Sequence, residues 1–318
     1  MITRKEFEDL LANRSVLIID GALATELENR GHDLTHPLWS AKTLREDPDA
    51  IQQVHLDYYL AGADVAITAS YQASVEGINE HFGLSKNDAM SLIGKSVELA
   101  QNARDEAYKQ IGHDRRLLVA GSIGPYGAYL ADGSEYRGDY KRSSDELQDF
   151  HRPRIQALVK AGVDILVIET IPQLQEIRCV LALLRAEFSD ALCWVSCTLQ
   201  DPNHLSDGSS IGQFIEVVGL PQHQERVVAV GVNCVPAHMV GSALRTFTLH
   251  TQLPLLCYPN SGETYDAQSN TWSGTAYDEG KVGDQVRIWR ERGAKMIGGC
   301  CRTGPEYIRL VSKALRDD

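Results

Sequence analysis

Short apolar segments recur at intervals along the whole chain, and there are eight of them. Within each segment Val, Ile and Leu form nearly continuous runs and do not alternate with polar residues. Strands that are buried on both faces show this pattern, as in parallel sheets covered by helices. We therefore expect eight buried strands, at Val16–Asp20, Asp64–Ser70, Leu117–Ile123, Asp164–Thr170, Leu192–Thr198, Val227–Asn233, Leu253–Pro259 and Ala294–Gly299.

Helical segments with recognisable start signals separate these strands. Asp47 and Pro48 provide an N-cap and a first-turn proline. Ser143 and Glu146 have the spacing of a capping box. We expect helices at 48–59, 85–108, 144–160, 173–188, 238–247 and 275–292, and an additional helix, 3–13, before the first strand.

Strands that alternate with helices predict βαβ units and a parallel sheet, which is the α/β fold class. Eight units predict a closed (β/α)8 TIM barrel, and the absence of any linker or repeat predicts one domain over residues 1–318. An open doubly wound sheet is the alternative, but no Gly-x-Gly-x-x-Gly turn supports it. Two long connections, Gly124–Ser143 and Asn260–Ser273, follow strands and should lie at the barrel face that holds active sites.

The charge balance narrows the possible partners. The chain has 31 Lys and Arg residues against 43 Asp and Glu residues, a net charge of −12, which argues against nucleic acid or an anionic membrane. The N-terminal residues are polar, and no apolar run has the length of a membrane span. We expect a cytoplasmic enzyme, a monomer or small homo-oligomer, whose partners are small-molecule substrates.

Cysteines at two strand ends indicate a metal site. Cys300 and Cys301 follow the eighth strand, and Cys234 ends the sixth, so strand parity predicts that the three thiols meet. Three thiolates with one open position are typical of catalytic zinc. His238 is a competing fourth ligand, but we expect it to face solvent from the next helix. The other four cysteines fit core packing: Cys179, Cys193, Cys197 and Cys257. Core packing is also the alternative role for the three clustered cysteines. Reduced thiols are the default in a cytoplasmic chain.

Two carboxylates complete the predicted barrel mouth. Asp20 ends the first strand and Glu169 the fourth. Both could be structural hydrogen-bond acceptors, but together they suit an ammonium group. A thiol-bearing amino acid would fit, with its sulfur on zinc, its amine on the carboxylates and its carboxylate on backbone N–H groups near Gly21 and Ala22.

Several motifs together resemble the zinc-dependent homocysteine S-methyltransferase family. They span nearly the whole chain, and their joint occurrence is far more specific than any one of them. The motifs are Asp20–Leu27, Thr68–Ser74, Gly121–Ala128, Gly231–Cys234, Tyr258–Glu263 and Gly298–Cys301.

The resemblance implies a zinc-bearing barrel that methylates homocysteine to methionine. Cys234, Cys300 and Cys301 match the family's zinc ligands. Asp20 and Glu169 match the positions that hold the homocysteine amine, and Asn233 lies close to the metal. Thr170 departs from the tyrosine of betaine-using relatives, which leaves the fourth zinc ligand open.

The loop from Gly124 to Tyr136 most resembles the branch that uses S-methylmethionine, and often S-adenosylmethionine, as methyl donor. Tyr126, Tyr129 and Tyr136 could offer ring faces to a sulfonium, and loop packing is the alternative. Other functional alternatives are a betaine-like donor, a selenol acceptor, and a non-catalytic zinc-binding barrel. A zinc hydrolase is disfavoured because no general base accompanies the thiols.

Overall fold

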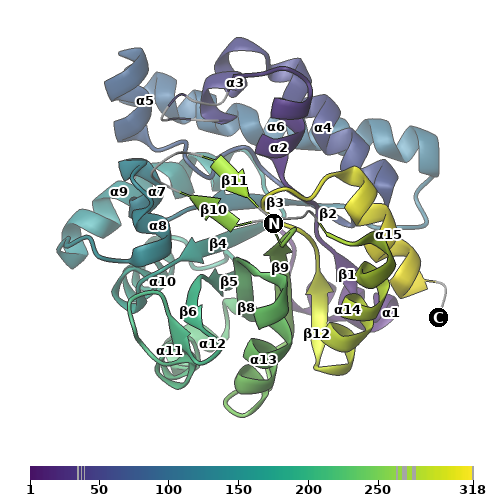
Figure 1. The fold of residues 1–318 in the computed structure, drawn as a ribbon. Helices are drawn as coiled ribbons and strands as arrows, with labels where there is room; N and C mark the ends of the chain where they lie inside the picture. Colours follow the sequence, from purple (N-terminus) through teal and green to yellow (C-terminus); the bar gives the residue numbers. More distant parts are fainter. Residues whose placement is uncertain are drawn as a thin grey trace.

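Eight parallel strands form one continuous sheet in the computed structural model, which describes residues 1–33, 36, 38, 40–262, 264–266, 271–273 and 277–316. The sheet order is β1-β12-β9-β8-β5-β4-β3-β2 (Figure 1). The eight strands are β1 (Leu17–Ile18), β2 (Val65–Ile67), β3 (Leu118–Ile123), β4 (Ile165–Ile171), β5 (Cys193–Cys197), β8 (Val227–Pro236), β9 (Leu255–Asn260) and β12 (Ala294–Ile297).

The sheet closes on itself between its two ends, β1 and β2. Ile19 and Val65 form a parallel bridge. The Asp20 N–H donates to the Val65 carbonyl at 3.0 Å, and the Asp64 N–H donates to the Ile18 carbonyl at 2.7 Å. The predicted (β/α)8 barrel is therefore confirmed, and each strand lies within one of the eight predicted segments or runs a few residues past its end.

Helices surround the barrel (Figure 1). Asp47 accepts a hydrogen bond from the Ala50 N–H, and Ser143 and Glu146 form the predicted capping box. The helices that cover the strands are α4 (Pro48–Ala61), α6 (Lys86–Ile111), α9 (Ser144–Lys160), α10 (Leu174–Glu187), α11 (Ile211–Val218), α13 (Ala237–Thr248), α14 (Glu279–Glu291) and α15 (Pro305–Arg316). Before them, α1 (Arg4–Arg14) places Phe7 and Leu10 in the cluster inside the barrel.

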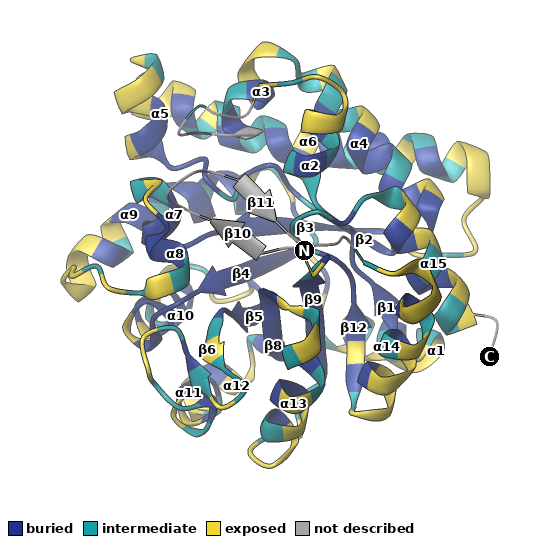
Figure 2. Cartoon of the chain, in the orientation of Figure 1, coloured by how far each residue is buried: buried dark blue, intermediate teal, exposed yellow. Residues whose placement is uncertain are grey.

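The core has two layers because successive residues of a strand point to opposite faces. Leu17 and Ile19 belong to the cluster inside the barrel, whereas Ile18 belongs to the cluster between the barrel and the helices. Figure 2 shows the consequence: the strands are buried along nearly their whole length, and the helices are buried only on the face toward them. This double burial explains the continuous apolar runs in the sequence.

The structure adds elements that the hydrophobic pattern did not predict. No helix was expected between the fifth and sixth strands, yet α11 lies there; its Ile, Val and Phe content is typical of strands. A capping box of Ser210 and Gln213 begins it and was a usable signal. The other additions are short pieces within loops: α2 (Leu23–Asn29), α3 (Ser40–Glu46), α5 (Val75–Phe82), α7 (Tyr126–Leu130), α8 (Ser134–Arg137), α12 (Pro221–Gln224), and the hairpins β6 (Leu199–Asp201) with β7 (His204–Leu205) and β10 (Thr264–Asp266) with β11 (Thr271–Ser273). Part of the predicted connection Asn260–Ser273, and Thr275, lie outside the described residues.

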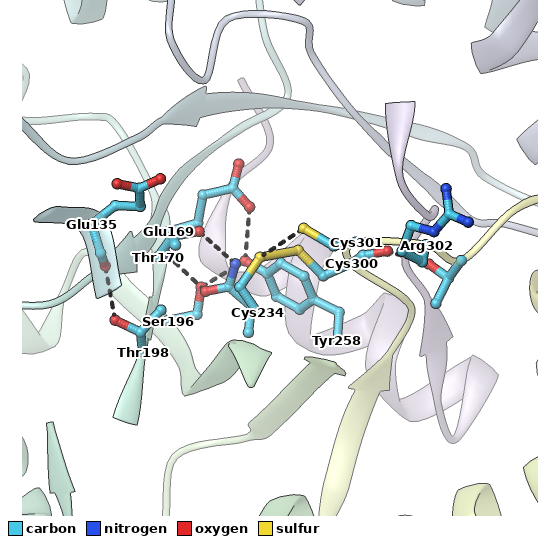
Figure 3. The surroundings of a disulfide bond; sticks show 12 residues. Glu135, Glu169, Thr170, Ser196, Thr198, Cys234, Tyr258, Cys300, Cys301 and Arg302 are labelled. Carbon is cyan, nitrogen blue, oxygen red and sulfur yellow. Dashed lines mark hydrogen bonds between the residues drawn. A yellow bond between two sulfur atoms is a disulfide. The ribbon is translucent and has the colours of Figure 1, made fainter. Parts of the chain in front are cut away.

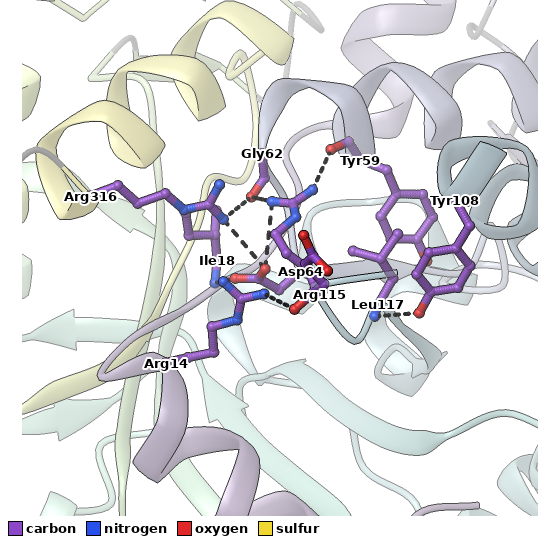
Figure 4. A network of polar contacts seen from close by, with 10 residues as sticks. Arg14, Ile18, Tyr59, Gly62, Asp64, Tyr108, Arg115, Leu117 and Arg316 are labelled. Carbon is purple, nitrogen blue, oxygen red and sulfur yellow. Dashed lines mark hydrogen bonds and ion pairs between the residues drawn. The ribbon is translucent and has the colours of Figure 1, made fainter. Parts of the chain in front are cut away.

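A buried carboxylate secures the end of the barrel opposite the predicted site. Asp64 accepts a hydrogen bond from the Ile18 N–H at 3.0 Å and lies 3.4 Å from Arg316 and 3.7 Å from Arg115 (Figure 4). Both guanidinium groups also donate to the Gly62 carbonyl at 3.0 Å. The network joins β1, the residue after α4, the segment just before β3 and the end of α15. These lie at the seam where the barrel closes.

Replacing Asp64 by alanine should lower the free energy of unfolding by about 3 kcal/mol or more, because it leaves Arg115 partly buried without its counter-charge. Urea unfolding followed by circular dichroism measures the change. Asp149→Ala is the matched control, since Asp149 pairs with Arg152 at the surface and should contribute less than about 1 kcal/mol. If the two variants lost equal free energy of unfolding, Asp64 would not be the stabilising centre of this network.

Candidate active site

Three cysteine side chains meet at the carboxyl end of the barrel. Cys234 lies near the end of β8, and Cys300 and Cys301 follow β12. Both strands pair with β9, which holds their ends on either side of it. The three sulfur atoms lie within 4.8 Å of one another. The structure thus brings together the three thiols singled out in the sequence.

Two of these cysteines are joined in the structure. Cys234 and Cys300 form a disulfide with a Cα–Cα separation of 5.5 Å, and Cys301 is free, with its sulfur 3.8 Å from that of Cys234 (Figure 3). The disulfide differs from the sequence-based prediction, which was that these thiols are reduced. It arises because the two strand ends fall within disulfide range. A metal-binding form requires both thiols to be reduced, because only the thiolate is a ligand.

The geometry fits a zinc ion. Thiolates that bind zinc tetrahedrally at about 2.3 Å lie about 3.8 Å from one another. The Cys234 and Cys301 sulfurs already have this spacing. His238 is exposed on α13 and is not part of the thiol cluster. In the described part of the chain the cluster therefore offers three thiols that could hold a metal ion, and a tetrahedral ion bound there would have a fourth position for another group.

Tight backbone packing positions the cysteines after β12. A Cβ atom on Gly298 would lie 2.7 Å from Ile19, and one on Gly299 would lie 2.1 Å from the Thr303 hydroxyl. Only glycine fits at either position. The Cys300 N–H donates to the Pro259 carbonyl at 2.7 Å, which ties the turn to the end of β9.

Three of the five described non-glycine residues with a left-handed backbone lie in the cysteine cluster or next to it and Glu169. Their φ angles are 59° for Thr170, 51° for Cys234 and 65° for Arg302. Such residues cost about 1–3 kcal/mol each and cluster at functional sites. Here each is a cluster cysteine or follows a key residue: Thr170 follows Glu169 and Arg302 follows Cys301. The strain is concentrated where the side chains converge.

Glu169 is buried beside the sulfurs and held by hydroxyl groups. Its carboxylate accepts hydrogen bonds from the Ser122 hydroxyl and, at 3.1 Å, from the Tyr258 hydroxyl. Ser196 lies 2.6 Å from the Tyr258 oxygen and orients it (Figure 3). Burial raises the pKa of Glu169 to about 7, and the two hydroxyl groups partly offset the shift.

Asp20 is the second buried carboxylate. It is 3% exposed, and it accepts a hydrogen bond from the Ile67 N–H at 2.8 Å, which fixes it across the β1–β2 seam. Burial raises the pKa of Asp20 well above its usual value, and the charge of Glu169 raises it further. The two carboxylates are therefore close enough to repel each other. A cation between them would relieve that repulsion.

The other predicted substrate residues support the backbone at this end. Asn233 uses both polar atoms on Thr170, accepting from its N–H at 2.8 Å and donating to its hydroxyl at 2.7 Å. The Ala22 N–H donates to the Thr303 carbonyl at 2.9 Å. A Cβ on Gly21 would lie 2.4 Å from the same carbonyl. These residues surround the site, and Asn233 stabilises the strained turn after Glu169.

The three loop tyrosines have different surroundings. Tyr126 and Tyr129 pack with Phe150 in an aromatic cluster against α9. The Tyr126 N–H donates at 2.7 Å to Glu176, a buried carboxylate of α10. Tyr136 instead reaches the sulfurs: burial raises the pKa of the Cys301 thiol to about 11, and a hydrogen bond from Tyr136 acts in the opposite direction. Only Tyr136 of the three contacts the cluster.

Sequence reasoning missed several residues that shape the site. Ser122 and Tyr258 hold Glu169, and Glu135 lies buried in α8 next to Tyr136. Ser122 and Tyr258 fall inside motifs that were recognised, so their position near strand ends was the available signal. Glu135 also falls inside the recognised loop Gly124–Tyr136, but its burial depends on how α7 and α8 fold over the mouth. The four remaining cysteines are buried in the core, as predicted.

Comparisons with known proteins point to one family. Its sequence profile, described as Homocysteine S-methyltransferase, matches residues 17–315. A relative named Homocysteine S-methyltransferase from Escherichia coli is 50% identical over 303 residues, covering 95% of this chain and 96% of the relative. A relative named Selenocysteine methyltransferase from Astragalus bisulcatus is 42% identical over 316 residues, covering 94% and 92% of the two chains.

Solved structures agree with these sequences. The homocysteine methyltransferase MmuM from Escherichia coli, in its metallated form, superposes with a TM-score of 0.86 at 46% identity, covering 96% of this chain and 98% of that one. The same protein in an oxidized form also superposes with a TM-score of 0.86. Membrane-spanning helices do not occur among the residues that the structure describes.

Proposed function

We propose that this chain, which belongs to the homocysteine S-methyltransferase family, binds one zinc ion through Cys234, Cys300 and Cys301 and uses a sulfonium as methyl donor. Methyl transfer to homocysteine is the family's activity, and the metal and the donor are the proposal. The observation that carries it is the meeting of three sulfurs within 4.8 Å, at the barrel end where Asp20 and Glu169 are buried.

The thiol cluster explains how the acceptor is activated. A free thiol is mostly protonated at neutral pH and is then a poor nucleophile. When bound, zinc would supply the charge that keeps the homocysteine sulfur deprotonated. The three cysteines leave an open position for that sulfur, which is the arrangement of a catalytic site.

The carboxylates explain how the acceptor is oriented. The ammonium group of homocysteine fits between Asp20 and Glu169, whose mutual repulsion it relieves. Its carboxylate would lie near Gly21, since the Ala22 N–H, also expected to bind it, already donates to the Thr303 carbonyl. Asn233 acts on this site through Thr170, so we assign it a positioning role beside Glu169. Holding the amino acid at these points aims its sulfur at the donor.

The transfer step needs no general base. The homocysteine sulfur attacks the methyl carbon, a new C–S bond forms, and the methyl bond to the donor sulfonium breaks. The electron pair of the broken bond stays on the donor sulfur, which becomes a neutral thioether. Opposite charges disappear in this step, so a site that excludes water favours it over separated ions in solvent.

S-Methylmethionine and S-adenosylmethionine both carry a sulfonium, and comparing them tests the donor assignment. With reduced, zinc-supplied enzyme, we expect homocysteine to be consumed faster with S-methylmethionine than with S-adenosylmethionine; homocysteine is followed because spent S-methylmethionine is itself methionine. Betaine, which is a quaternary ammonium, should give no product. If betaine were the one donor that gave methionine, the sulfonium assignment would be wrong, and the chain's membership of the family would be unaffected.

A selenol acceptor is the second candidate, and the Astragalus relative named Selenocysteine methyltransferase favours it. Offering homocysteine and selenocysteine together at equal concentration separates the two. Because S-methylmethionine itself becomes methionine when it loses a methyl group, the quantities to compare are homocysteine consumed and methylselenocysteine formed, and we expect more homocysteine to be consumed. More methylselenocysteine formed than homocysteine consumed would assign the chain to the selenol instead.

The acceptor affinity should depend on pH through Glu169. Its pKa of about 7 means that the substrate-free carboxylate takes up a proton as the pH falls below neutrality. A protonated carboxyl no longer attracts the ammonium, so the KM for homocysteine should rise roughly eightfold between about pH 7.5 and about pH 6. Steady-state kinetics at saturating donor measure this. Glu169→Gln should have a raised KM and lose most of that pH dependence; an unchanged profile would remove Glu169 from the amine site.

The remaining predictions complete the proposal. The homocysteine-binding zinc barrel would occupy residues 1–318 as one domain. A cytoplasmic location would keep Cys234 and Cys300 reduced and able to bind metal. The chain would act as a monomer or small homo-oligomer on small-molecule substrates.

A further inference from the structure

Buried oxygen atoms without hydrogen-bond partners are confined to one end of the molecule. Within the described ranges they are Gln72 Oε1, Glu135 Oε2 and Asn260 Oδ1. Gln72 follows β2, Glu135 lies in α8 after β3, and Asn260 ends β9, so all three are at the carboxyl end of the barrel. The buried nitrogen atoms without partners belong to helices or turns around the barrel: His55, Arg154, His223 and Arg226.

Unpaired buried acceptors are costly, and each calls for an explanation. The barrel mouth has three of them, and a ligand that brings positive charge or N–H groups would satisfy them. Glu135 is the most demanding of the three because it can carry a full negative charge. It is 5% exposed, and burial raises its pKa to about 7.

Glu135 lies next to the thiol cluster. The following residue, Tyr136, hydrogen-bonds Cys301, and Glu135 is close enough to raise the pKa of the Tyr71 and Tyr136 phenols. Burial is the larger cause of both shifts. Figure 3 shows Glu135 at the edge of this group, with its backbone carbonyl joined to Thr198, and Glu169 between it and the sulfurs in this view.

The backbone of Glu135 is held firmly. Its carbonyl accepts a hydrogen bond from the Thr198 hydroxyl at 3.2 Å. A Cβ on Gly127 would lie 2.6 Å from the Glu135 backbone nitrogen, so α7 and α8 pack with no space between them. The carboxylate is therefore presented from a fixed position.

Among the residues that the structure describes, no basic side chain forms an ion pair with this carboxylate. The charge of Arg137 lowers the pKa of Glu135, but its guanidinium lies half-exposed and pairs with Asp139 at 2.9 Å and with Asp132 at 3.7 Å. Asp20 and Glu169 act on each other electrostatically and are the carboxylates assigned to the homocysteine amine. Glu135 is thus a third acidic group of the site, with its own position and no assigned partner.

We infer that the Glu135 carboxylate is the counter-charge for the sulfonium of the methyl donor. The inference rests on the proposed function, because it assumes a sulfonium donor. A sulfonium has no N–H or O–H to donate, so only charge and ring faces can recognise it, and Glu135 and Tyr136 supply both. The free oxygens of Gln72 and Asn260 suit the donor's ammonium group, which does have N–H groups to donate.

The inference makes a specific kinetic demand. The sulfonium loses its positive charge as the methyl group leaves, so attraction to Glu135 stabilises bound donor more than the transition state. Removing the charge should raise the KM for the donor and leave kcat unchanged or higher. A residue that only supported the loop would lower kcat and alter both substrates.

Glu135→Gln tests this in zinc-loaded enzyme. We expect the KM for S-methylmethionine to rise about 10-fold or more, with the KM for homocysteine within twofold of wild type and zinc content unchanged. Glu135→Asp keeps the negative charge, so its KM for S-methylmethionine should fall between those of wild type and Glu135→Gln. Asp139→Asn is the matched control, because it removes one exposed negative charge from the same loop and should leave the donor KM within twofold.

A second measurement compares ligand binding and does not depend on turnover. Homoleucine has the shape of S-methylmethionine with an uncharged CH in place of the sulfonium sulfur. Calorimetry on the wild-type enzyme should show tighter binding of S-methylmethionine than of homoleucine, and Glu135→Gln should lose that preference. Equal binding of the two ligands by wild type, or a wild-type donor KM in Glu135→Gln, would overturn the inference. If wild type turned over no sulfonium at all, the proposed function itself would fail instead.

Discussion

Replacing Cys300 by alanine is expected to abolish both zinc binding and methionine formation. Cys300 is one of three sulfurs that lie within 4.8 Å of one another, and two thiolates cannot complete the predicted donor set. Loss of a group that only supports a zinc ligand costs about 10–100-fold, so loss of a ligand should reduce turnover by more than about 100-fold. Metal analysis and a methionine assay on the same reduced sample measure both effects.

The barrel itself should survive this substitution. Cys300 is partly buried at the mouth, whereas the fold depends on the strand pairing and on the apolar layers below. Circular dichroism should therefore be that of the wild type. Cys179→Ala is the matched control, since it removes a buried thiol from α10 and should keep zinc and activity. A metal-free Cys300→Ala protein with wild-type turnover would refute the metal assignment.

Replacing Asp20 by asparagine should weaken homocysteine binding and leave zinc in place. Asparagine can still accept the hydrogen bond from the Ile67 N–H, so the β1–β2 seam is kept. What is lost is the charge opposite the substrate ammonium. Breaking a buried charge pair costs about 2–5 kcal/mol, which corresponds to a rise of about 30-fold or more in the KM for homocysteine.

A carboxylate at the other end of the barrel provides the comparison for Asp20. Asp64 is also buried, but it is paired with Arg115 and Arg316 far from the sulfurs. Asp64→Asn should lower stability and leave the KM for homocysteine near its wild-type value. If Asp20→Asn had wild-type kinetics, the amine would bind elsewhere and Asp20 would be a structural acceptor only.

The sequence predicted the parts of this molecule that depend on periodicity. Strands buried on both faces appear as unbroken apolar runs, so the barrel and the strand ends that carry Asp20, Glu169 and Cys234 could be located. Parity of the strands then predicted that the thiols meet. Short loop elements such as α8 were not predictable, because neither hydrophobic pattern nor length distinguishes them from irregular loop.

Pairings between distant residues were also beyond the sequence. Asn233 was expected near the metal and substrate, and the structure adds two hydrogen bonds from its amide to Thr170, a contact between β8 and β4 that the sequence did not predict. Tyr126 and Tyr129 were grouped with Tyr136 by their spacing in one loop, yet they pack against Phe150. Side-chain direction in a loop depends on its tertiary packing, which spacing alone does not encode.

The most direct test of the central claim is a zinc titration of reduced, metal-free enzyme, with methionine formation from homocysteine and S-methylmethionine measured at each step. The account predicts negligible activity without metal, a linear rise, and a plateau at about one zinc per chain. Full turnover in the metal-free protein, or a plateau of bound zinc with no methionine from any sulfonium, would contradict it.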